Sequence, residues 1–328
     1  MNKNKIITLL GLFAMSMMIM AQGSEKLVSN QILNQKVVDE GGSGMFNAVA
    51  LEEKDDKGRD EKANNFKTLW IKNGDRNIFG IIGKPHYTGK KQPIAIIAHG
   101  FNGSHTYSLA YFNELNKMGY QCYAFDFPCG SLNSRSDNNT HNMSILDEQS
   151  DLEAIVKYFK SQPDIDADNI VLIGESQGGL VSALTAASLP KDVTKLVLVF
   201  PALCIPDNWN QRYPKVSDIP DTTTLWDVPI GRRFFLEIRD MDVFKTIKRF
   251  KKPVLIVQGD ADAVVSMDDS RRAVKNYKTA SLHVIPSAGH GFKPHEFEES
   301  MGVIKEFLSE ERRMKSEKWE CCIFAEIK

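Results

Sequence analysis

Ser176 stands in the sequence context of a catalytic nucleophile. It is the centre of Gly174-Glu175-Ser176-Gln177-Gly178, a G-x-S-x-G sequence that directly follows the apolar run Ile170–Ile173 and precedes a helix rich in small residues. That order of strand, tight turn and helix is typical of a nucleophile elbow, which projects the serine hydroxyl above a sheet. At the start of a helix, the dipole also favours a developing negative charge.

A serine hydroxyl needs a general base, and His290 is the first candidate. It lies in a glycine-flanked loop, Ala288–Phe292, after the last apolar strand, and His295 is the reserve candidate. Asp260 and Asp262 both follow the preceding strand, and such a carboxylate would orient the imidazole. Each aspartate could be an ordinary turn residue. That interpretation does not account for the order Ser, Asp, His, in which each residue follows a successive strand.

Two backbone N–H groups are expected to bind the oxyanion that forms during acyl transfer. One belongs to Gln177, the residue after the nucleophile. The other belongs to Phe101, in the loop His99-Gly100-Phe101-Asn102-Gly103 that follows an earlier apolar strand. We expect His99 to brace this loop.

The elements that must position these residues alternate between apolar strands and helical patterns. The strands show little in–out alternation, which indicates parallel strands buried on both faces. They are Ile94–Ala98, Gln121–Phe127, Ile170–Ile173, Lys195–Phe200, Val254–Gln258 and Ser281–Ile285, and the helices between them are Tyr107–Met118, Asp147–Ser161, Gln177–Ser188, Ser266–Tyr277 and Pro294–Ser309. Asn73-Gly74 predicts a preceding hairpin. The pattern predicts an α/β fold with a doubly wound, mostly parallel sheet.

The domain organisation follows from the segments that do not fit this alternation. Residues 1–23 have the basic, apolar and small-residue layout of a signal peptide, so we expect an exported protein, periplasmic or secreted, with no membrane span after cleavage. Residues 24–65 are polar and predict a loosely ordered lead-in, in which Phe46–Leu51 is a candidate edge strand. Residues 66–309 form the expected catalytic domain, with an inserted cap at about 203–250, and residues 310–328 form a tail.

Composition excludes several classes of function. The 328 residues carry a formal charge of −1 and are 42% hydrophobic, which is typical of a globular protein and argues against nucleic-acid binding. No cluster of His, Cys or Asp has metal-ligand spacing, and the chain has no P-loop and no G-x-G-x-x-G, so we predict no metal and no cofactor.

Four segments together resemble the α/β-hydrolase superfamily, and within it the bacterial cinnamoyl (feruloyl) esterases. They are HGFNG at residues 99–103, GESQGG at 174–179, GDADAVVS at 259–266 and AGHGF at 288–292. The segments Ile219-Pro220-Asp221 and GRRFFLEI, residues 231–238, are similar to the small cap of those esterases. The resemblance implies the α/β-hydrolase fold, and its acid loop, G-x-x-D-x-V-V, favours Asp262 over Asp260. Glu175 departs from the family, which commonly has His there.

The resemblance also implies an activity, a serine esterase acting on small-molecule or oligosaccharide esters. Candidate contacts for an aromatic acyl group are Trp209, Trp226 and Phe234. The alternative is that these side chains only pack the cap onto the core. Asp207 is a candidate partner for a phenolic hydroxyl. Two other functions stay open: a serine amino- or acylpeptidase, with acidic cap residues binding the substrate amine, and a non-catalytic binding protein of this fold.

Overall fold

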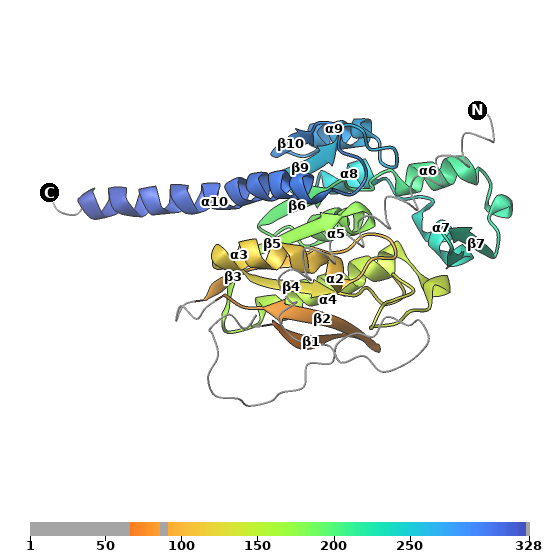
Figure 1. Ribbon diagram of the computed structural model, residues 1–328, viewed down its shortest axis with the longest axis horizontal. Coiled ribbons are helices and arrows are strands. Elements are labelled where there is room, and N and C mark those ends of the chain that lie inside the picture. Colours follow the sequence, from red (N-terminus) through yellow and green to blue (C-terminus); the bar gives the residue numbers. More distant parts are fainter. Residues whose placement is uncertain (1–65, 86–90, 326–328) are drawn as a thin grey trace.

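The computed structural model describes residues 66–85 and 91–325, which form an eight-stranded sheet and a separate two-stranded hairpin (Figure 1). The large sheet has the order β1-β2-β4-β3-β5-β6-β9-β10. Its strands are β1 Phe66–Asn73, β2 Arg76–Gly83, β3 Gln92–Ala98, β4 Gln121–Phe125, β5 Ile165–Glu175, β6 Lys195–Val199, β9 Val254–Gly259 and β10 Ala280–Ile285. The signal peptide, the lead-in and the edge strand predicted at Phe46–Leu51 lie outside the described residues.

The sheet is parallel from β4 to β10, as predicted, and antiparallel only where β1 and β2 join it. The chain passes from β3 to β4 on one side and then crosses to β5 on the other. In such sheets, ligands bind at the carboxyl ends of the strands where the winding direction switches. By this rule we expect a ligand site at the ends of β3 and β5, the strands that precede His99 and Ser176.

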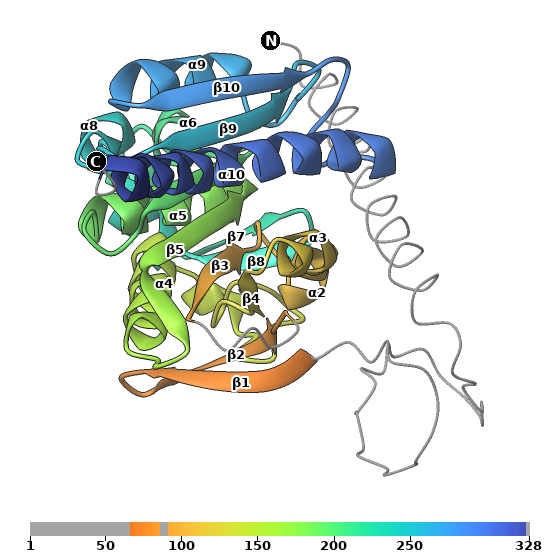
Figure 2. The same cartoon turned by 90° about the vertical axis from the view of Figure 1, so that its left-hand side faces the viewer.

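Helices cover both faces of the sheet (Figure 2). Alternate residues of β3 point to opposite faces of the sheet and enter two apolar clusters. Ile94 and Ile96 pack on one face, which is covered by α4, α5, α8 and α9. Ala95 and Ile97 pack on the other face, which is covered by α3 and α10. The helices are α2 His105–Ser108, α3 Phe112–Lys117, α4 Ile145–Lys160, α5 Ser176–Ser188, α6 Ile205–Arg212, α7 Arg232–Ile238, α8 Val243–Ile247, α9 Met267–Asn276 and α10 Pro294–Ala325. Helix α10 continues past Ser309, where the sequence predicted its end.

One predicted helix and the predicted hairpin differ from the structure. A 3₁₀ turn, η1 Leu109–Tyr111, divides the segment predicted at Tyr107–Met118 into α2 and α3. The first hairpin is also shifted by one residue, because Asn73 pairs with Arg76 and the loop is Gly74-Asp75. Gly74 has a φ of 58°, a conformation that favours glycine. Asn73 stays in the strand, where its side chain donates a 2.7 Å hydrogen bond to Asp151.

The inserted segment after β6 forms a small cap at one end of the molecule (Figure 1). It contains α6, the 3₁₀ turn η3 Val216–Asp218, the hairpin β7 Thr222–Leu225 with β8 Val228–Gly231, and helices α7 and α8. The cap is tied to the N-terminal end of α4, since Arg233 of α7 lies 2.8 Å from Asp147. Ser144, the N-cap of α4, also donates a hydrogen bond to Glu237 of α7.

Candidate active site

The nucleophile elbow forms where β5 ends and α5 begins. Ser176 is the first residue of α5 and has a φ of 50°, a left-handed conformation that costs free energy for a residue with a side chain. Gly178 permits the tight packing behind it. A Cβ on Gly178 would lie 2.4 Å from the carbonyl oxygens of Ala98 and His99, so only glycine lets α5 approach the end of β3 this closely. The local sequence thus produces the turn that the G-x-S-x-G context predicted.

The structure brings Ser176, His290 and Asp262 into one hydrogen-bonded chain. Ser176 Oγ lies 3.0 Å from His290 Nε2, and His290 Nδ1 lies 2.9 Å from Asp262 Oδ2. The other oxygen, Asp262 Oδ1, accepts hydrogen bonds of 2.8 and 2.9 Å from the backbone N–H groups of Val264 and Val265. The side chains of His290 and Asp262 are 5% and 1% exposed. Because the carboxylate holds Nδ1–H, His290 Nε2 is left to accept a proton from the serine hydroxyl.

The reserve candidates lie elsewhere. Asp260 Oδ1 accepts a 2.6 Å hydrogen bond from the backbone N–H of Ser287 and so closes the loop that carries His290. His295 is 76% exposed on α10, and its nearest carboxylate is Glu296 at 3.9 Å. The ring of Phe200, which follows β6, packs 4.9 Å from the His290 ring and holds the imidazole in place.

The loop after β3 lies directly beside Ser176. A Cβ on Gly100 would stand 3.1 Å from the Ser176 Cβ. The Gly100 carbonyl accepts hydrogen bonds from His99 Nδ1 at 2.7 Å and from the Gly103 N–H at 3.0 Å. In a trans peptide the N–H points opposite to the C=O, so these bonds set the direction of the Phe101 N–H. Within the described residues, the Phe101 N–H donates to no acceptor.

His99 has the bracing position that the sequence predicted. Its Nε2 accepts a 3.1 Å hydrogen bond from the Phe127 N–H, which requires that Nδ1 carries the proton and donates to Gly100. The ring is 1% exposed, and burial lowers the pKa of His99 below its ordinary value of 6.5. The imidazole is therefore neutral at pH 7, with both nitrogens used in the loop.

Two carboxyl groups flank the elbow, the half-buried Glu175 and the buried Glu148, and sequence reasoning missed their contacts. Glu175 accepts a 2.6 Å hydrogen bond from Tyr111 Oη, and burial raises the pKa of Glu175 to about 7. Glu148 of α4 accepts bonds of 2.9 and 3.0 Å from Gln177 Nε2, and burial raises the pKa of Glu148 to about 8. One signal could have found Glu148: it precedes Leu152 by four residues on the apolar stripe of α4.

The structure separates the predicted substrate contacts. Trp226, at the tip of the β7–β8 hairpin, packs edge-on against the Phe101 ring at 5.7 Å, next to the oxyanion loop. Trp226 and Asp227 have φ values of 48° and 64°, which are the left-handed conformations that a type I′ two-residue hairpin turn requires. Trp209 instead packs 4.7 Å from Phe235 within the cap, and Phe234 is 2% exposed in the core.

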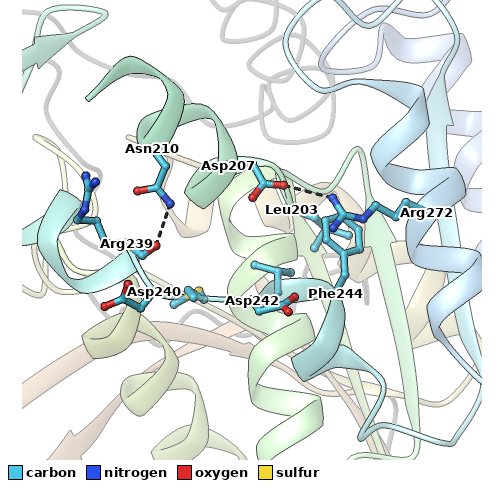
Figure 3. A pocket seen from close by; sticks show the side chains of 10 residues that line it. Leu203, Asp207, Asn210, Arg239, Asp240, Asp242, Phe244 and Arg272 are labelled. Carbon is cyan, nitrogen blue, oxygen red and sulfur yellow. Dashed lines mark hydrogen bonds and ion pairs between the residues drawn. The ribbon is translucent and has the colours of Figure 1, made fainter. Parts of the chain in front are cut away.

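Asp207 lies in a polar groove between the cap and α9 (Figure 3). The groove has a volume of about 360 Å³. Asp207 forms a 3.2 Å ion pair with Arg272, whose guanidinium group lies 3.7 Å from the centre of the Phe244 ring. The structure shows no contact between Asp207 and the described residues around Ser176.

In residues 66–85 and 91–325, no three His, Cys, Asp or Glu side chains gather as a metal site would require. No helix in those ranges has the length and apolarity needed to cross a membrane.

Comparison with known proteins agrees with the fold and with the sequence resemblance. The family model for the alpha/beta hydrolase fold matches residues 93–231, from β3 through the elbow to the cap hairpin. The chain has the α/β-hydrolase fold, and its sequence is similar to that of the α/β-hydrolase superfamily. A solved structure of Est1E from Butyrivibrio proteoclasticus with ferulic acid bound is 26% identical, with a TM-score of 0.67, and the match covers 74% of this chain and 98% of that one.

Two curated relatives are also similar in sequence. Monoacylglycerol lipase ABHD6 of Rattus norvegicus is 26% identical over 171 residues, which is 52% of this chain and 49% of that protein, so the match spans about half the length of the relative. "Putative esterase/lipase 2" of Mycoplasma pneumoniae is 24% identical over 271 residues, covering 71% of this chain and 94% of the relative.

Proposed function

We propose that this protein is an exported serine hydrolase that cleaves carboxylic esters, with cinnamoyl or feruloyl esters as its substrate class. The observation that carries the proposal is the chain of hydrogen bonds from Ser176 through His290 to Asp262 at a nucleophile elbow. The esterase and lipase names of the similar proteins support the ester chemistry, and the basic and apolar layout of residues 1–23 supports export.

The chemistry follows from the positions of these groups. His290 takes the proton of Ser176 Oγ as the oxygen attacks the ester carbonyl, and Asp262 stabilises the imidazolium that forms. The N–H groups of Phe101 and Gln177 bind the oxyanion. His290 then protonates the leaving alcohol, which leaves an acyl group on Ser176. Water enters, gives its proton to His290, and releases the acid by the same steps.

The cinnamoyl substrate class rests on narrower support. Est1E, a similar protein, is described with ferulic acid bound, and the match covers 98% of its chain. In this protein the half-buried Trp226 packs edge-on against the buried Phe101 ring of the oxyanion loop, near the place where the acyl group of an ester bound at Ser176 would lie. A planar aromatic acyl group can pack against such rings.

A substrate panel with one inactivating variant tests the proposal. The mature protein is assayed with methyl ferulate, methyl cinnamate, p-nitrophenyl acetate and an aminoacyl p-nitroanilide, and Ser176→Ala is assayed beside it. We expect ester hydrolysis with methyl ferulate preferred, and a fall in kcat by a factor of roughly 10⁴ or more in Ser176→Ala.

Each other result has a definite meaning. Ester turnover that persists in folded Ser176→Ala rejects the assignment of the nucleophile. Preference for the anilide supports the peptidase alternative. A wild-type protein that a fluorophosphonate probe does not label and that hydrolyses no ester would support the non-catalytic alternative.

A further inference from the structure

Glu148 is a buried carboxyl group that the proposed chemistry does not use. It lies in the first turn of α4, is 1% exposed, and accepts two hydrogen bonds from the side-chain amide of Gln177, which is itself 4% exposed. Burying a carboxyl group costs free energy unless its partners compensate for the lost water. A residue at this position therefore needs a reason beyond filling space.

The same carboxyl group also packs against the loop that supports the other oxyanion donor. A Cβ on Gly130 would lie 3.3 Å from Glu148 Oε1, so the Gly130 backbone is close to the carboxyl group. The Gly130 carbonyl accepts a 3.0 Å hydrogen bond from the N–H of Asn102, the residue after Phe101. Glu148 thus contacts the side chain of Gln177 directly. It is linked less directly to Phe101, because it lies near Gly130, whose carbonyl is hydrogen-bonded to the residue after Phe101.

Packing alone does not explain this residue. Leu152 and Ile155, one and two turns further along α4, are fully buried and join the apolar core. A leucine at position 148 would continue that stripe without burying a carboxyl group. It would leave the Gln177 amide without its acceptor, however, and a buried N–H group that loses its partner is free to turn or draw in water. The Gln177 side chain would then no longer hold the backbone at the elbow.

We propose that Glu148 is a positioning residue for the oxyanion hole: by holding the Gln177 side chain and supporting the Gly130 loop, it directs the N–H groups of Gln177 and Phe101 at the reacting carbonyl. This inference rests on the proposed function, because it concerns the same site. The Gln177 backbone N–H belongs to the first turn of α5, where it has no intrahelical acceptor and is available to a substrate. Its direction depends on how firmly the residue is held.

Four variants test the role of Glu148. Glu148→Leu removes the acceptor, and Gln177→Met removes the tether from the other side but keeps the backbone N–H. Glu148→Gln keeps an amide oxygen that can accept from Gln177. Glu153→Gln, on the same helix, is the matched control, because the Glu153 side chain contacts only Gln149 and Lys157 of α4 among the described residues.

The readouts are kcat and KM for p-nitrophenyl acetate, and the inhibition constant of an aryl trifluoromethyl ketone, which forms an oxyanion on Ser176. We expect Glu148→Leu and Gln177→Met each to lower kcat by roughly 10- to 100-fold and to weaken the ketone by a similar factor, with KM nearly unchanged. The double variant is expected to lose little more than either single one, because both remove the same contact. Glu148→Gln and Glu153→Gln should keep wild-type kcat within about threefold.

Circular dichroism and a thermal melt establish that each variant is folded. If folded Glu148→Leu and Gln177→Met keep kcat and ketone affinity within about twofold of wild type, the positioning role is wrong. If Glu148→Leu does not fold, the kcat and ketone affinity of folded Gln177→Met alone decide whether the positioning role is right, with the same twofold limit. These outcomes require an active wild type. An inactive wild type, or an active Ser176→Ala, rejects the proposed function itself.

Discussion

The direction of the Gly100–Phe101 peptide group depends on the ring of His99. His99 Nδ1 donates to the Gly100 carbonyl, and Nε2 accepts from Phe127, so both ring nitrogens are used. A protonated ring would lose the bond from Phe127, and burial keeps the pKa of His99 below 6.5. In the proposed mechanism, the preorganisation of the oxyanion hole therefore depends on a neutral histidine whose ring nitrogens are both used within the loop.

Replacing His99 by phenylalanine tests this dependence. The variant keeps a ring of similar size but neither hydrogen bond, so the Phe101 N–H loses its fixed direction. We expect kcat for an aryl ester to fall by roughly 10- to 100-fold, with a smaller change in KM. His283→Gln is the control, since His283 is partly exposed on β10 and contacts Glu299. An equal loss in both variants, or none in His99→Phe, contradicts the assigned role.

At the scale of elements, the contact between α5 and β3 sets the position of the nucleophile. Gly178→Ala would place a Cβ 2.4 Å from two backbone oxygens at the end of β3, and backbone cannot move aside as a flexible side chain can. We expect a loss of about 3 kcal/mol or more in the free energy of unfolding, together with loss of activity.

The chain contains a matched control for this substitution. Gly302 lies in α10, and a Cβ there would meet no atom within 4 Å. Gly302→Ala should stabilise the protein by up to about 1 kcal/mol, because alanine favours the helix. Urea unfolding of both variants gives the measurement, and similar stabilities for the two would contradict the packing argument.

The sequence predicted the elements well where a local pattern defines them. The apolar runs located the strands of the parallel sheet, and the order Ser176, Asp262, His290 was sufficient to predict residues that the structure brings together. Local patterns failed where tertiary contacts decide the conformation. The segment at Tyr107–Met118 is helical by pattern, yet a 3₁₀ turn interrupts it at Tyr111, whose hydroxyl reaches Glu175.

The contacts of Glu148 could not be predicted from spacing. Glu148 and Gln177 are 29 positions apart, on two helices whose packing the sequence pattern does not specify. The same holds for the cap. The sequence predicted an inserted cap at about 203–250 but not the bounds of the helices within it, where α7 ends at Ile238 and α8 begins at Val243. Among the aromatic candidates in the cap, Trp226 is the one that packs against Phe101. It does so because it lies at the tip of the β7–β8 hairpin, a position that the sequence pattern did not predict.

At the scale of the whole molecule, buried carboxyl groups make stability depend on pH. Burial, together with the nearby charges of Asp151 and Asp147, raises the pKa of Glu148 to about 8, and burial raises that of Glu175 to about 7. The unfolded chain releases these protons near pH 4.5, whereas the folded protein keeps them. Their stabilising contribution is therefore complete below about pH 4.5 and is lost as pH rises through 7 and 8.

We expect the free energy of unfolding to fall between pH 6 and pH 8, by at most about 1.4 kcal/mol per pH unit for each of the two groups. The double variant Glu148→Gln/Glu175→Gln should have a flatter profile over this range. Urea titrations at several pH values give the comparison. Parallel profiles for wild type and variant would show that the two carboxyl groups titrate as they do in the unfolded chain.

Helix α5 begins with Ser176 and is buried from Gln177 to Ala187, packed against the sheet and helices α4 and α8. Backbone amides in such an element exchange with solvent hydrogen only when the whole domain opens. The proposed nucleophile therefore belongs to the last part of the molecule to lose its structure, and not to a loop that unfolds early. On heating, ester hydrolysis and the native fold should be lost in one transition, and residual activity then measures the fraction of molecules still folded.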